Sequence, residues 1–90
     1  MPDTRLERDI ELLQRRGGYD WLINGPESWF ADDVATRLTA MGIRVTRKTV
    51  GEWFKDLPNT QNFGKLGLSA TRADLIHFFA GKFVSRTADG

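Results

Sequence analysis

Residues 46–58 read TRKTVGEWFKDLP, which is the pattern of a short helix with both ends marked. Thr46 is a residue type that caps helix N-termini, and Pro58 cannot continue a helix. The apolar residues between them recur at i, i+3, i+4 and i+7 and form one stripe: Val50, Trp53, Phe54 and Leu57. We therefore expect a helix that buries this stripe against the rest of the protein.

The other side of this helix carries two features that helix stability does not explain. Arg47 and Lys48 fall in the first turn, where the positive end of the helix dipole disfavours cations. Gly51 weakens a helix interior by roughly 1 kcal/mol relative to alanine. A helix N-terminus in the major groove of DNA explains the cations, because Arg and Lys can bond guanine edges or phosphates. The alternative is an ordinary solvated pair of charges.

A second helix is predicted just before this one. It starts between Pro26 and Ala31 and extends to about Met41, with apolar residues at helical spacing: Phe30, Val34, Leu38 and Met41. Gly42 is expected to end it, and GIRV (42–45) connects it to the helix that Thr46 begins. Two helices joined by so short a glycine-led turn are typical of a helix-turn-helix.

The pattern changes after Pro58. NTQNFGKLGLSA (59–70) alternates polar and apolar residues around Gly64-Lys65 and predicts a two-stranded hairpin. Thr71 and Asp74 have the spacing of a capping box, which begins a last helix. Its expected buried residues are Leu75, Ile76, Phe78, Phe79 and Phe83. His77, the single histidine, is expected on the solvent side of that helix.

The N-terminal segment is predicted to begin with a helix of its own. Thr4 and Glu7 form a capping box, an apolar stripe follows at Leu6, Ile10 and Leu13, and RRGG (15–18) ends the helix. YDWLINGP (19–26) fits either a short helix or an extended segment. We divide the chain into residues 1–24, a helix and connector that pack on the domain or mediate self-association, residues 25–84, the main domain, and residues 85–90, a flexible tail.

Composition limits the classes of protein that fit. Ninety residues with 40% hydrophobic content predict a single domain with a modest core. The absence of cysteine excludes disulfides, cysteine zinc sites and thiol catalysis, and one histidine alone cannot build a metal site. The start of the chain is charged from its third residue, unlike a secretory signal, and no apolar run is long enough for a membrane span. A cytoplasmic protein associated with the nucleoid is expected.

The net charge of +1 conceals an uneven distribution. Residues 17–36 contain four acidic residues and no Lys or Arg, whereas residues 37–55 contain five cations and only one acid, Glu52. A basic segment of this kind is the electrostatic pattern that a nucleic-acid interface leaves, although a solvated face of mixed charge has the same composition.

In order, these elements predict a mainly α fold with a small β-hairpin, a winged helix-turn-helix with an extra N-terminal helix. The sequence resembles the small excisionase and prophage-regulator proteins, whose domain is related to the MerR-like winged helix. The resemblance covers about residues 29–80 and rests on DDVATRL, VTRKTVGEWF, the LP that closes that helix, and GKLGLSATRADLIHFF. The matching positions are Asp33, Val34, Ala35, Thr46, Arg47, Lys48, Thr49, Val50, Trp53, Pro58, Gly64, Lys65, Asp74 and Leu75.

The resemblance implies sequence-specific binding of double-stranded DNA by a phage or mobile-element protein, either an excisionase-like architectural factor or a transcriptional regulator. A homodimer or a cooperative array on DNA is expected, with an integrase as a further partner. The predicted DNA-binding residues are Arg44, Thr46, Arg47, Lys48, Thr49, Gly51, Glu52, Lys55 and Lys65. Arg44, Thr46 and Lys65 would contact phosphates, while Arg47, Lys48 and Glu52 would read base edges.

Two other functions remain open. The chain could be the DNA-recognition domain of a terminase small subunit, although it lacks the expected long C-terminal helix. It could also be a protein-interaction module that uses Trp21, Trp29 or the first helix. No catalytic motif or carboxylate pair with a plausible base is present, so we expect no enzymatic activity, no catalytic residues, no cofactor and no metal.

Overall fold

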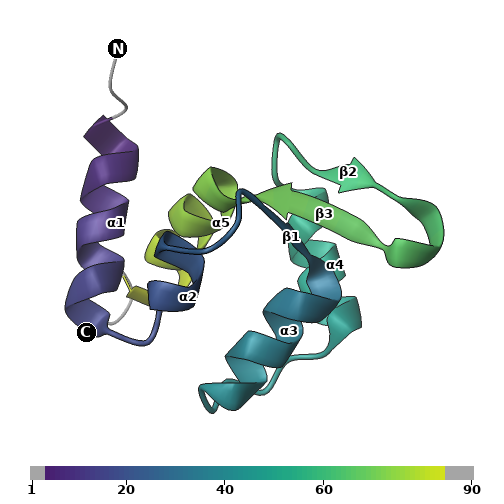
Figure 1. Cartoon of the computed structure of the whole chain (residues 1–90), viewed down its shortest axis with the longest axis horizontal. Helices are drawn as coiled ribbons and strands as arrows, with labels where there is room; N and C mark the ends of the chain where they lie inside the picture. Colours follow the sequence, from purple (N-terminus) through teal and green to yellow (C-terminus); the bar gives the residue numbers. More distant parts are fainter. Residues whose placement is uncertain (1–3, 85–90) are drawn as a thin grey trace. The chain divides into compact units, whose positions relative to one another are not determined.

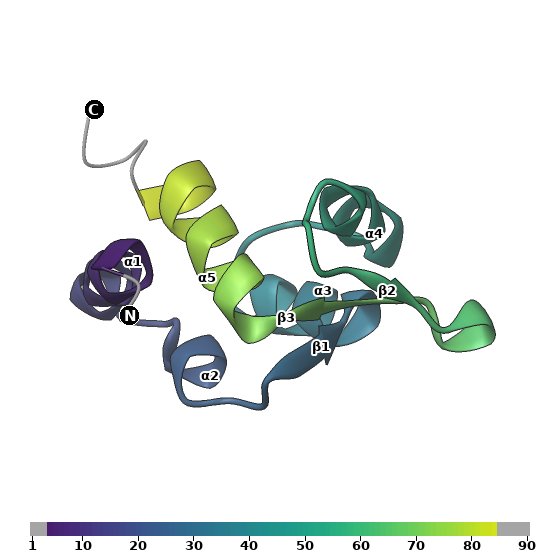
Figure 2. The same ribbon diagram turned by 90° about the horizontal axis from the view of Figure 1, so that it is seen from above.

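Helices form most of the computed structural model, which describes residues 4–84 (Figures 1 and 2). The fold is mainly helical (64%) with a small three-stranded antiparallel sheet, which confirms the predicted mainly α class. The predicted flexible tail, 85–90, lies outside the described residues. In chain order the elements are α1 (Thr4–Arg16), α2 (Asp20–Ile23), β1 (Ser28–Phe30), α3 (Ala31–Ala40), α4 (Arg47–Lys55), β2 (Gln61–Asn62), η1 (Gly64–Leu66), β3 (Leu68–Thr71), α5 (Arg72–Phe79) and η2 (Ala80–Val84).

The elements group into two compact units. Unit 1 contains residues 4–26 and 72–84, and unit 2 contains residues 27–71. Within unit 1, α5 packs against α1 and α2, so its apolar residues are buried by elements far away in sequence. The functional division at residues 24 and 25 stays a prediction.

Unit 1 is built around aromatic side chains. Phe79 is fully buried, and its ring lies 5.5 Å to 6.3 Å, between centroids, from four others: Tyr19, Trp21, Phe78 and Phe83. These separations fall in the favourable range for tilted and edge-to-face pairs. The segment whose structure the sequence left open contains the short helix α2. In α1, Leu13 is fully buried while Leu6 and Ile10 are half-buried.

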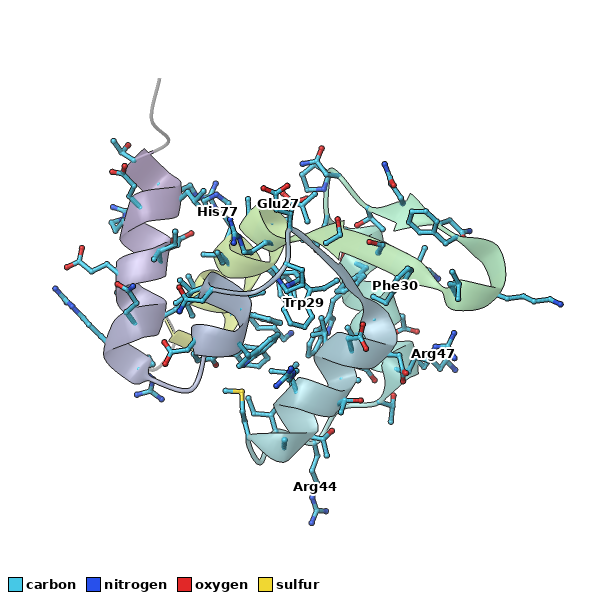
Figure 3. The ribbon with its side chains drawn as sticks, in the orientation of Figure 1. Glu27, Trp29, Phe30, Arg44, Arg47 and His77 are labelled. Atoms are coloured by element: carbon cyan, nitrogen blue, oxygen red, sulfur yellow. The ribbon has the colours of Figure 1, made fainter. Side chains whose placement is uncertain are left out.

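His77 corrects one prediction from the sequence, because it does not lie on the solvent side of α5. Its Nδ1 is 2.6 Å from Oδ2 of Asp9 on α1, and the two side chains are only 20% and 11% exposed (Figure 3). The helical stripe of α1 places Asp9 beside Leu13, so the acid faces α5 and provides a polar partner there.

The turn between the two helices of unit 2 has a defined hydrogen-bond pattern. Gly42 has φ of 91°, its N–H donates to the Thr39 carbonyl, and the Ile43 N–H donates to the Leu38 carbonyl at 2.9 Å. These two bonds form a Schellman motif, which ends α3 and leaves GIRV as the connection to α4. The predicted glycine stop is confirmed, and Phe30 lies in β1 rather than in the helix.

The sheet has the strand order β1-β3-β2, with β3 in the centre. The predicted hairpin is confirmed: Gln61 pairs with Ser69, and Asn62 pairs with Leu68. The strand β1 was not expected; its central residue, Trp29, pairs with Ala70. Trp29 is only 6% exposed, so the interaction module that would use this residue as a docking surface is not supported by its position.

The core of unit 2 lies where α3 and α4 pack against each other and against the sheet. Its fully buried large side chains are Val34, Leu38, Val50 and Phe54. Two of them come from the predicted stripe of α4, whereas Trp53 and Leu57 are half-buried at its margins. The rotation of α4 about its axis is therefore determined by Val50 and Phe54.

We predict that Asp9→Ala lowers the free energy of unfolding by about 1–3 kcal/mol, because His77 loses a short hydrogen bond in a largely buried place. Chemical denaturation at neutral pH measures this loss. Glu11→Ala is the matched control, because it removes a carboxylate of α1 whose ion pair with Arg15 is exposed and screened. Equal stabilities of the two variants would contradict a structural role for the Asp9–His77 pair.

Candidate nucleic-acid interface

The N-terminus of α4 is capped as the sequence predicts. Thr46 is extended, and its Oγ1 accepts a hydrogen bond of 3.2 Å from the Thr49 N–H. The two hydroxyl oxygens are 3.1 Å apart, so one donates to the other. This cap satisfies one of the backbone N–H groups at the helix start and offsets part of the cost of placing cations there.

One face of α4 points away from the core of unit 2. Because successive residues of a helix are rotated by about 100°, the positions opposite Val50 and Phe54 are Lys48, Glu52 and Lys55. All three side chains are exposed. Lys48 and Glu52 are four residues apart and lie on adjacent turns, so the face contains one acid between two cations.

Arg47 is three residues before Val50, so it lies on the side of the helix that carries the buried stripe, where it is exposed at the helix start and near the hairpin. A Cβ built at Gly67 would be 3.3 Å from Arg47 Nη2, so the guanidinium lies near Gly67, the residue before β3. Gly67 has φ of 93° and ψ of −164°, a conformation that is essentially restricted to glycine. The guanidinium of Arg47, in the first turn of α4, is therefore close to the hairpin.

Gly51 lies one turn after Arg47 and is half-buried rather than fully exposed. A Cβ added there would meet no atom within 4 Å outside the local helix backbone. The glycine is therefore not required by a close contact inside unit 2. The backbone at Gly51 is helical and does not have a positive φ, which is the conformation that would require glycine.

The connection between α3 and α4 carries Arg44, which is exposed and extends outward (Figure 3). It borders an open hollow of about 340 Å³ whose other lining residues are Thr39, Val45, Thr46 and Thr49. The hollow therefore combines threonine side chains with one cation at the start of α4. Arg44 and the threonine hydroxyls are groups that can contact a phosphate.

The hairpin carries the remaining predicted residue, Lys65, which is exposed in η1. The predicted cations come from three places in unit 2: the turn before α4, α4 itself and the hairpin turn. Within residues 4–84, none of them makes a hydrogen bond or an ion pair through its side chain: Arg44, Arg47, Lys48, Lys55 and Lys65. Their charges are not neutralised by a neighbour in the part of the chain that the structure describes.

Two surface residues of the hairpin were not among the predicted site residues. Phe63 and Leu66 belong to the segment FGKLG, which the sequence assigns to the turn of the hairpin without distinguishing its apolar members. Both side chains are exposed. Two bulky apolar residues on either side of a Gly-Lys turn are the signal that could have identified them.

Among residues 4–84, no three His, Asp or Glu side chains are close enough to hold a metal ion. None of the helices in that range is long and apolar enough to cross a membrane. In comparisons with known proteins, the chain matches no family model, no curated protein and no solved structure.

Alanine substitutions at Gly51 and Gly67 should change the free energy of unfolding in opposite directions. Gly51→Ala should raise the free energy of unfolding by up to about 1 kcal/mol, because alanine is the better helix former and its methyl group enters open space. Gly67→Ala should lower it by about 1–3 kcal/mol, because the backbone there is strained for any other residue. Thermal or urea unfolding measures both. A loss of stability in Gly51→Ala would mean that the glycine has a structural role in unit 2.

Proposed function

We propose that unit 2 is a winged helix-turn-helix and that the chain binds double-stranded DNA. In this proposal α3, the Gly42 turn and α4 are the helix-turn-helix, α4 enters the major groove, and the β2–β3 hairpin is the wing. The observation that carries the proposal is the group of five exposed cations on α4, the turn before it and the hairpin. They lack intramolecular partners in the described part of the chain.

The orientation of α4 supports this assignment. Burial of Val50 and Phe54 leaves Lys48 and its neighbours directed outward, and the first turn of a recognition helix is the part that reaches base edges. Lys48 can donate to guanine, and Glu52 can accept from the amino group of cytosine. Gly51 lets the backbone on that side of the helix approach the groove without an intervening side chain.

Phosphate contacts would come from the elements on either side of α4. Arg44 and the hydroxyl of Thr46 lie at the start of the helix, and Lys65 lies at the hairpin turn. Such contacts position a protein on DNA without reading its sequence. Arg47 lies between the two elements, next to Gly67, and can serve either the groove or the backbone.

The biological role that we propose follows from the resemblance to excisionases and prophage regulators. A module of this size buries only about 600–1,000 Å² on DNA, so one copy binds modestly. A homodimer or a side-by-side array would add affinity, and α1, whose Leu6 and Ile10 are half-buried, is the proposed contact between copies. An integrase is the further partner expected of an excisionase, and the nucleoid is the expected location.

We predict that the full chain shifts random-sequence duplex DNA in a gel at low salt, and that the affinity depends strongly on salt. With roughly four to six phosphate contacts, the slope of log K against log salt concentration should be about −4 to −5, because bound cations release counterions. Fluorescence anisotropy over a salt series measures the slope. Binding that is indifferent to salt, or no binding at all, would refute the proposed function.

Removing a cation from α4 and removing one from the hairpin should affect DNA binding in different ways. Lys48→Ala should cost about 1–3 kcal/mol on a selected duplex and broaden sequence preference, because it removes a base contact. Lys65→Ala should weaken all duplexes alike and reduce the salt slope by about one. Arg8→Ala, an exposed cation of α1, controls for net charge and should bind nearly as the wild type does. Binding to the selected and unrelated duplexes, measured side by side, distinguishes these outcomes; equal losses on both for Lys48→Ala would contradict base reading.

A further inference from the structure

The turn of the hairpin exposes apolar surface that the proposed phosphate contacts do not explain. Within residues 4–84, two large hydrophobic side chains are exposed: Phe63 is 47% exposed and Leu66 is 65% exposed. They lie on either side of Gly64 and Lys65 in the same turn. Single exposed apolar residues are ordinary, but two at the end of one hairpin form a local apolar feature.

Hydrogen bonds hold this turn in a defined conformation. The Phe63 N–H donates to the Gly67 carbonyl at 2.9 Å and closes the turn, while the Gly67 N–H donates to the Gly64 carbonyl at 3.0 Å. The side-chain oxygen of Asn62 accepts from the Gly64 N–H at 2.8 Å. Both glycines have positive φ. The side chains of the turn are therefore presented by an ordered backbone.

The two apolar side chains differ in how the rest of unit 2 holds them. Phe63 packs edge-to-face on Phe30 of β1, with 5.6 Å between the ring centroids, so its ring is anchored to the sheet. Leu66 has the larger exposed fraction and is carried by η1 next to Lys65. In both ribbon views the turn projects past α4 at the free end of the hairpin (Figures 1 and 2).

We propose that Leu66 is a wedge that inserts between base pairs from the minor groove and kinks the DNA. This inference rests on the proposed DNA binding and specifies what the hairpin does to the duplex. Minor-groove proteins insert residues such as Leu or Phe at a base step, unstack it partly and bend the helix by about 20–90°. Here Lys65 would neutralise the neighbouring phosphate, and Phe63 would support the wedge from the sheet.

Charge and size favour DNA over a protein partner for this turn. Lys65 lies within it, and the guanidinium of Arg47 lies beside its last residue, Gly67, so cations adjoin the apolar tip. Two side chains also provide far less than the roughly 800 Å² per partner of a standard protein interface. A wedge needs only one inserted side chain, because the energy comes from the wider contacts that a bent duplex allows.

The wedge also predicts where the hairpin binds. Pyrimidine–purine steps such as TA and CA unstack most easily, so sequences selected by the protein should contain such a step at the hairpin position. The preference would arise without any hydrogen bond to the bases at that step. It is therefore distinct from the base reading proposed for Lys48.

The test uses the full chain and a duplex that it selects from a random pool. The ends of the duplex carry a donor and an acceptor dye, and 2-aminopurine replaces the adenine of the proposed step. The wild type should bring the ends closer and raise the 2-aminopurine fluorescence. Leu66→Ala should lose both signals and bind about tenfold more weakly with the salt slope unchanged, because an apolar side chain contributes no counterion release.

Two further variants make the result specific. Leu66→Met keeps a bulky apolar side chain and should retain both signals, whereas Lys65→Ala should reduce the salt slope and retain most of the bend. Melting temperatures should be nearly equal, because Leu66 is exposed. Binding without bending by the wild type, or a full bend with Leu66→Ala, would overturn the wedge and leave the DNA-binding function intact. No binding by the wild type would overturn both.

Discussion

The burial of Val50 and Phe54 is the constraint on which the organisation of unit 2 depends. A nine-residue helix is too short to be stable in water by itself, so α4 exists because its apolar stripe packs against α3 and the sheet. That packing also sets the rotation of the helix. Lys48 and Lys55 point outward as a consequence, and the chemistry of the exposed face follows from the placement of the buried one.

Several residues outside the buried stripe of α4 lower the intrinsic stability of this helix. Cations in the first turn oppose the helix dipole, and Gly51 is a poor helix former at a position where a methyl group would meet no other atom. The Thr46 cap and the Schellman turn at Gly42 offset this by fixing the start of the helix and the end of the one before it. Features that weaken an element without a packing reason are expected at binding surfaces.

The parts of the fold that local signals encode were predictable, and those that depend on distant pairing were not. The capped stripe of α4, the stop at Gly42 and the β2–β3 hairpin each depend on residues within a few positions of one another. By contrast, β1 is three residues long and exists because it pairs with β3 about forty residues later. His77 shows the same limit, since its partner Asp9 lies on another helix. The predicted cations are exposed as expected, but which of them adjoin the hairpin could not be read from their spacing.

In the proposed DNA complex, the closeness of Arg47 to Gly67 would let unit 2 combine two kinds of recognition. The nine-residue α4 would make few base contacts and would distinguish only a few base pairs. The hairpin, as the proposed wedge, would add preference at a base step that is read through its stiffness rather than through hydrogen bonds. The start of α4 and the hairpin belong to one compact unit, and the Arg47 guanidinium lies near Gly67, so the separation of these two elements is defined within unit 2. The spacing between the bases contacted by α4 and the step kinked by Leu66 would then be constant. A DNA site would need both features at that spacing, so binding would be more selective than with either contribution alone.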